Sequence, residues 1–148
     1  MNGKILLVNG PNLNMLGIRE PEKYGNQKLM EIVEEIDKIA EQNGFKLVSL
    51  QSNCEGDLVD FIQKEGINGK GLIINAGAYT HTSIAIRDAI LSVKIPSIEV
   101  HLSNIFARED FRHHSYLSDI AIGVICGFGP NSYYLAIKAM IDFIAKSR

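Results

Sequence analysis

The stretch "LIINAGAYTHTSIAIRDAILSVKIPSIEVHL", residues 72–102, decides the fold. It opens with an apolar run at 72–76, continues with a helical pattern at 82–93, and ends with a second strand-like run at 97–102. A strand, a helix and a strand in this order predict two parallel strands joined by a right-handed crossover. Because the first run is almost continuously apolar, we expect a strand buried on both faces, as in a parallel sheet.

The same alternation of strand and helix extends in both directions along the chain. Similar apolar runs cover 5–9, 46–50 and 120–126, and helical patterns cover the segment between Asn26 and Gly44, then 55–66 and 131–146. Five such strands separated by helices predict an α/β fold, a flavodoxin-like three-layer sandwich around a five-stranded parallel sheet in the order 2-1-3-4-5. With 148 residues we expect one catalytic domain covering 1–148.

Composition and charge exclude several classes of protein. Hydrophobic residues make up 46% and charged residues 22%, an ordinary globular balance, and the net charge of −2 offers no basic field for nucleic acid or an anionic membrane. Cys54 and Cys126 have no metal or redox spacing, which fits a reducing compartment. We see no signal peptide and no membrane span, so we expect a cytoplasmic protein.

Polar residues gather where three of the predicted strands end. They follow the first, third and fourth strands, in the segments "NGPNLNMLGIREPEKYG" (9–25), "NAGAYTHTS" (75–83) and "HLSNIFAREDFRHHSYLS" (101–118). In open parallel sheets, ligands bind beyond the carboxyl ends of the strands. We therefore expect the functional site at this edge of the sheet.

Several chemistries fit these residues poorly. A metal site lacks a spacing such as HExxH, and the adjacent His113 and His114 point apart on most backbones. A serine hydrolase would need a GxSxG elbow, and Ser103 lies on the same rigid strand as His101. A phosphoacceptor receiver domain would need an aspartate where this chain has Asn75.

Two weaker alternatives remain open on the sequence. The "GFGPN" segment (127–131) resembles half of a phosphate loop before a helix, as a flavin or nucleotide module would have, although a tight turn explains it as well. A Schiff-base mechanism would need a lysine in a loop, and Lys23 is the candidate.

Acid–base chemistry accounts for the fourth strand and the first loop together. Glu99 and His101 share one face of their strand, so the carboxylate can hold the imidazole in one tautomer and favour its protonated form, a general acid. Tyr24 is the candidate base. A phenol has a pKa of about 10, so Tyr24 needs cations such as Arg19 and Arg108 to stabilise its phenolate.

Four blocks together carry a resemblance to a known family. They are "GPNLNMLGIREPEKYG", "QSNCEGDLVDFI", "NAGAYTHTSIAIRDAI" and "EVHLSNIFAREDFRHHSYLS", and they closely resemble the type II 3-dehydroquinate dehydratases, over nearly the whole chain and in the right order. The resemblance implies a lyase that removes water from 3-dehydroquinate to give 3-dehydroshikimate in the shikimate pathway, by trans elimination through an enolate. It implies no cofactor and no metal.

The resemblance also implies the residues that act. The implied catalytic groups are Tyr24 as the base, Arg19 and Arg108 as the cations beside it, Asn12 placing a water against the enolate oxygen, His101 as the acid, and Glu99 orienting it. The implied substrate contacts are Asn75 and the backbone amides of Leu102 and Ser103 for the carboxylate, His81 and Arg112 for the ring hydroxyls, and Asp88 for a neighbouring subunit's site. The last contact implies a homo-oligomer, since the family forms dodecamers of four trimers.

Overall fold

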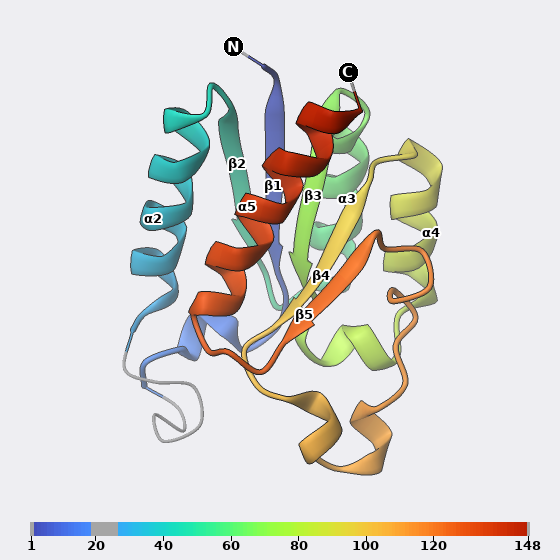
Figure 1. Ribbon diagram of the computed structural model, residues 1–148. Coiled ribbons are helices and arrows are strands. Elements are labelled where there is room, and N and C mark those ends of the chain that lie inside the picture. The colour runs from blue at the N-terminus through green and yellow to red at the C-terminus, as the bar shows by residue number, and fades with distance from the viewer. Residues whose placement is uncertain (1, 19–26, 148) are drawn as a thin grey trace.

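The fold is a parallel sheet between two layers of helices. The computed structural model describes residues 2–18 and 27–147. The strands are β1 (Lys4–Asn9), β2 (Lys46–Gln51), β3 (Gly69–Asn75), β4 (Ser97–His101) and β5 (Gly123–Cys126), and the helices are α2 (Leu29–Gln42), α3 (Glu55–Gly66), α4 (Ile84–Val93) and α5 (Asn131–Lys146). All strand pairs are parallel, in the order β2-β1-β3-β4-β5, which confirms the predicted flavodoxin-like topology (Figure 1).

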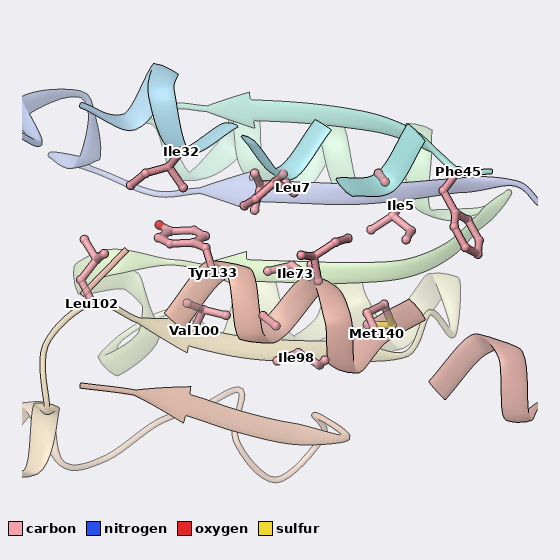
Figure 2. Packing of buried hydrophobic residues seen from close by; sticks show 14 of the residues in the cluster. Ile5, Leu7, Ile32, Phe45, Ile73, Ile98, Val100, Leu102, Tyr133 and Met140 are labelled. Carbon is pink, nitrogen blue, oxygen red and sulfur yellow. The ribbon is translucent and has the colours of Figure 1, made fainter. Parts of the chain in front are cut away.

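Each face of the sheet has its own hydrophobic core, because side chains alternate along a strand. On one face Ile5, Leu7 and Ile73 pack with residues of α2 and α5 (Figure 2). On the other face, intervening residues such as Leu6 and Leu72 pack with α3 and α4. The near-continuous apolar runs of the central strands therefore reflect burial on both sides.

The burial on both faces that is expected for the run at 72–76 does not extend to the two edge strands. Most of β2 and β5 is only half-buried or exposed in this single chain, and Val124 is 41% exposed. The fifth strand was also predicted to begin at residue 120, whereas β5 begins at Gly123. A turn closed by the amide of Ala121 on the carbonyl of Leu117 occupies the start of the predicted run, so pairing with β4 begins later.

Short helical turns fill the loops at the carboxyl ends of the strands. They are the 3-10 turns η1 (Leu13–Met15), η2 (Gly77–His81), η3 (Ile105–Ala107) and η4 (Asp110–Arg112). Three strands of the sheet, β1, β3 and β4, thus deliver their loops to the same edge (Figure 1). Within residues 2–18 and 27–147, no helix has the length and apolar character needed to cross a membrane.

The start of α4 is fixed by a side-chain cap. The cap is Ser83, whose buried Oγ accepts a hydrogen bond from the amide of Ile86 at 2.9 Å. This bond satisfies one of the helix's otherwise unpaired N–H groups. Thr82 is exposed beside it.

We expect Ser83→Ala to lower the free energy of unfolding by about 1 kcal/mol, because the cap is lost and nothing replaces it. Thr82→Ala is the matched control and should change the free energy of unfolding by less than about 0.5 kcal/mol. Urea unfolding of both variants at one protein concentration measures the difference. Equal losses in the two variants would contradict the assignment of the cap.

Candidate active site

One pocket at the carboxyl edge of the sheet collects most of the predicted site residues. Eight of them line it: Asn12, Asn75, His81, His101, Leu102, Ser103, Arg108 and Arg112. They come from the loops after β1, β3 and β4, three segments that are far apart in the sequence. Apolar side chains such as Leu16 and Ile105 complete the wall. The pocket therefore combines polar groups with apolar surface, as small-molecule sites do.

The remaining predicted residues lie elsewhere. Glu99 is fully buried and contacts His101 without lining the pocket itself. Asp88 is exposed on α4 and does not line this chain's pocket. Arg19 and Tyr24 lie outside the described residues.

The pair formed by Glu99 and His101 ends β4. Nε2 of His101 lies 2.6 Å from Oε2 of Glu99, and the His101 side chain is only 6% exposed. Because Nε2 is engaged by the carboxylate, Nδ1 is the ring nitrogen available to a ligand. The backbone at the carboxyl end of β4 is fixed by two hydrogen bonds, since the amides of Gly127 and Gly129 donate to the carbonyls of His101 and Leu102.

The second oxygen of Glu99 is occupied by two hydroxyl groups. Ser115 Oγ and Ser118 Oγ donate to Oε1 at 2.8 and 2.7 Å. Burial raises the pKa of Glu99, but the hydrogen bonds from His101, Ser118 and Ser115 and the charge of His101 outweigh it, so the pKa lies below its ordinary value. The carboxylate is therefore ionised where it meets the imidazole.

His81 lies against His101 in the pocket. The two rings are stacked, with centroids 6.4 Å apart and planes inclined by 17°. Nδ1 of His81 donates to the carbonyl of His114 at 2.7 Å, which fixes the tautomer and leaves Nε2 as an acceptor. Burial lowers the pKa of His81, and the nearby positive groups His101 and Arg112 lower it further. Its imidazole is therefore neutral at neutral pH.

Asn75 is oriented by a buried chain of hydrogen bonds. Its Nδ2 donates to the Tyr133 hydroxyl at 2.9 Å, and that hydroxyl donates to Oδ1 of Asn9 at 2.6 Å. Oδ1 of Asn75 accepts from the amide of Gly77. Tyr133 is completely buried, and burial raises its pKa, so it stays a neutral donor. One N–H of the Asn75 amide is left to face a ligand.

Asn12 adopts an unusual backbone conformation that a neighbouring loop supports. Its φ is 69°, in the left-handed region, which an asparagine tolerates better than most residues. The amide of Asn12 donates to Oδ1 of Asn53 at 3.0 Å. Nε2 of Gln51 bonds both Asn53 and the carbonyl of Gly10, and Tyr79 bonds the Asn53 carbonyl. The loop after β2 thus holds the loop after β1.

Two arginines and one carboxylate set the charge at the pocket wall. Nε of Arg112 donates to Oε1 of Glu109 at 3.0 Å, and Nε of Arg108 lies 3.8 Å from the same oxygen. A hydrogen bond from its own backbone lowers the pKa of the Glu109 carboxyl, and the hydrogen bond from Arg112 lowers it further. Two positive charges and one negative charge leave this side of the pocket positive, which favours an anionic ligand.

The structure gives little support to a phosphate loop, a serine nucleophile or a metal site. In the "GFGPN" segment the amides of Gly127, Phe128 and Gly129 donate to carbonyls of the β4 end and to Ser132 Oγ, so the segment is a tight turn rather than a free phosphate cradle. Within the described residues, Ser103 makes no hydrogen bond to His101, as a nucleophile and its base would. No cluster of three metal-ligating side chains occurs in residues 2–18 and 27–147.

Several residues that shape the site were missed by reasoning from the sequence. They are Gln51, Asn53, Ser115, Ser118 and Tyr133. Ser115 and Ser118 belong to the block that ends in "HHSYLS", and Asn53 belongs to the block that begins with "QSNCEG". Both blocks carry the family resemblance, and that was the only signal in the sequence that these three residues matter. Tyr133 is 58 residues from Asn75, and no local pattern predicts such a contact.

Comparisons with known proteins find relatives that match nearly the whole chain. The family profile described as "Dehydroquinase class II" matches residues 3–141. A 3-dehydroquinate dehydratase of Prochlorococcus marinus (strain NATL1A) is 54% identical over 142 residues, 96% of this chain and 98% of that protein. A 3-dehydroquinate dehydratase of Photorhabdus laumondii is 54% identical over 148 residues, 99% of each chain.

The fold comparison leads to the same family. The crystal structure of a type II dehydroquinase from Butyrivibrio crossotus has a TM-score of 0.88 to this chain and is 46% identical, covering 93% of this chain and 96% of that one. The profile covers most of the sequence, and the relatives match over nearly their whole lengths. The chain belongs to the class II dehydroquinase family.

Proposed function

We propose that this chain removes water from 3-dehydroquinate to give 3-dehydroshikimate, as a lyase of the shikimate pathway, by trans elimination through an enolate. The observation that carries the proposal is the Glu99–His101 pair, in which His101 lines a positively charged pocket of a chain of this family. A ketone makes the neighbouring C–H bond acidic enough for a modest base. The substrate is an anion, which the pocket's charge favours.

The first step is removal of a proton next to the ketone by the phenolate of Tyr24. Arg19 and Arg108 lower the pKa of this phenol by favouring its charged form. The proposal that arginines stabilise the phenolate is supported by Arg108, which lines the pocket. Charge then builds on the enolate oxygen, where a water held by Asn12 donates a hydrogen bond.

The second step is loss of the hydroxyl group, which His101 protonates. Because Nε2 of the pocket-lining His101 is engaged by Glu99, the proton comes from the other ring nitrogen, Nδ1. His101 must be an imidazolium before it can give this proton away, and the negative charge of Glu99 stabilises that imidazolium. Base and acid on different loops fit departure of the two groups from opposite faces of the ring.

One group of residues binds the carboxylate of the substrate and another binds its ring hydroxyls. Asn75, with its spare amide N–H, and the backbone amides of Leu102 and Ser103 bind the carboxylate. The free Nε2 of His81 accepts from a ring hydroxyl, and Arg112 binds beside it. These contacts are the ones a polyhydroxylated carboxylate needs.

Asp88 lies exposed on α4, away from this chain's own pocket, which leaves it accessible to the site of a neighbouring subunit. We infer a homo-oligomer, a dodecamer of four trimers, that works in the cytoplasm in aromatic amino acid biosynthesis through chorismate.

Purified protein given 3-dehydroquinate should generate the absorbance of a conjugated enone, and Tyr24→Phe should lose about 10²–10⁴-fold in kcat because the base is gone. The variant should still bind substrate, as measured by calorimetry. Tyr134→Phe, which removes a hydroxyl bonded to Gln27 outside the pocket, is the matched control and should keep its activity. A fully active Tyr24→Phe would rule out the assigned base.

His101→Ala should slow loss of water about 10²-fold or more while the first proton transfer continues. In deuterated water the variant should exchange the substrate proton next to the ketone without forming product, which proton NMR detects. Unchanged turnover, or loss of exchange and elimination in equal measure, would reject His101 as the acid of the second step.

A further inference from the structure

Two serines contact the buried carboxylate that the proposed reaction depends on, and the proposed function gives them no role. Ser115 and Ser118 lie in the segment between η4 and β5, and each donates its hydroxyl to Oε1 of Glu99 (2.8 and 2.7 Å). The other oxygen, Oε2, is used by Nε2 of His101. Glu99 itself has no exposed surface, so water does not share in these bonds.

The hydroxyl proton of Ser115 has one direction available to it. Its Oγ accepts hydrogen bonds from the amides of Leu117 and Ser118, at 3.0 and 3.1 Å, which occupies both lone pairs. The proton must therefore be given away, and Oε1 of Glu99 receives it. Oε1 is thus held as an acceptor, which suits an ionised carboxyl.

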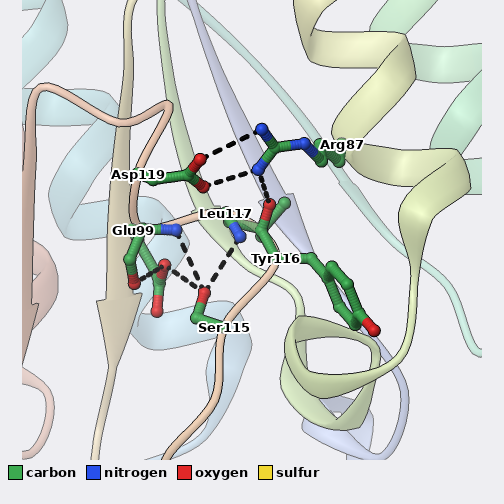
Figure 3. Close-up of polar contacts among 7 residues, drawn as sticks. Arg87, Glu99, Ser115, Tyr116, Leu117 and Asp119 are labelled. Atoms are coloured by element: carbon green, nitrogen blue, oxygen red, sulfur yellow. Dashed lines mark hydrogen bonds and ion pairs between the residues drawn. The ribbon is translucent and has the colours of Figure 1, made fainter.

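The turn that carries the serines is fastened to α4. Nη1 of Arg87 donates to the carbonyl of Tyr116 at 2.9 Å, and Nη2 of the same guanidinium pairs with Asp119 at 3.0 Å (Figure 3). Figure 3 shows Ser115 beside Glu99, with Arg87 bound to Tyr116 and Asp119 of the same turn. Movement of the turn is therefore restrained from the helix side as well as from the strand side.

The charged groups around Glu99 are few. Its neighbours in register on β3 and β5 are the uncharged Ile74 and Val124. On β4 the titratable neighbour is His101, and from η2 His81 stacks on that ring, with Arg112 of η4 close enough to lower the pKa of His81. The charges of Arg87 and Asp119 from α4 and the turn neutralise each other. The serines are the donors that counter burial at Oε1.

We propose that Ser115 and Ser118 are positioning residues, which hold Glu99 as a carboxylate with Oε2 directed at His101 and so keep the imidazole oriented and charged for proton transfer. This inference rests on the proposed function, since it concerns the same acid. Neither serine lines the pocket, so they act through Glu99 rather than by touching the substrate.

The direction of the effect follows from the balance at Glu99. Burial raises the pKa of this carboxyl and the hydrogen bonds lower it, so removing two of the bonds moves the pKa up. A carboxyl that takes up its proton at higher pH no longer stabilises the imidazolium there. The acid limb of kcat/KM should therefore move to higher pH when the hydroxyls are removed.

The test compares kcat/KM against pH for wild type, Ser115→Ala, Ser118→Ala and the double variant. Each bond to the charged group is worth enough to move the acid limb by about one to two pH units, so each single variant should shift it by about one unit or more and the double variant by more than either. Ser118→Thr retains a hydroxyl and should keep the wild-type limb. Ser132→Ala is the control, a buried serine that accepts from the amide of Phe128 away from Glu99 and should leave the limb unmoved.

A second measurement needs no turnover and separates this inference from the proposed function. A carboxyl whose pKa is lowered in the folded protein adds stability above its ordinary pKa of 4.5, and the protein loses that stability as the pH falls through the folded-state pKa. In urea unfolding from about pH 6 down to about pH 3, the double variant should gain less stability above pH 4.5 than wild type and Ser132→Ala, and should lose less as the pH falls.

The outcomes divide cleanly. A wild type with no dehydratase activity would refute the proposed function, and a stability shift in the double variant would still support the hold on Glu99. An active wild type whose acid limb and stability profile are both unchanged in the double variant would overturn the positioning role. A uniform loss of kcat with no change of either profile would also overturn it, because that result indicates only structural damage.

Discussion

A buried negative charge on a central strand is the constraint on which the site depends. Glu99 has no exposed surface, and taking an ionised carboxylate out of water costs several kcal/mol unless it is paired and hydrogen-bonded. Here three donors satisfy it: His101 on one oxygen, and Ser115 and Ser118 on the other. Bonds of this kind to a charged group are worth about 1.5–3 kcal/mol each, so together they offset the burial.

This constraint explains how the sheet and its loops are arranged. The face of β4 that carries Glu99 and His101 meets the turn at 115–118, whereas the opposite face supplies Ile98 and Val100 to the core with α2 and α5. The parallel sheet brings the loops after β1 and β3 to the same edge, where hydrogen bonds between loops fix Asn12 and Asn75. Rigid strands thus orient the polar groups, and the loops lock them.

The fold was accessible from the sequence because apolar runs and helical periods are local. The strand order and the helices α2, α3, α4 and α5 were predicted from them. The edge exposure and the late start of β5 were not, since both depend on which strand ends the sheet. The chemistry of Glu99 and His101 was readable from their spacing of two. Contacts such as Asn12 with Asn53 were not, because they join loops 41 residues apart.

The central claim is that Glu99 is ionised and that the proton between the two groups resides on Nε2 of His101. Nitrogen-15 NMR of histidine-labelled protein near neutral pH tests it directly, with His101→Asn used to assign the signal. We expect a proton bonded to Nε2 of His101, seen as a one-bond nitrogen–proton coupling. An Nε2 that carries no proton, with the proton on the carboxyl of Glu99, would contradict it.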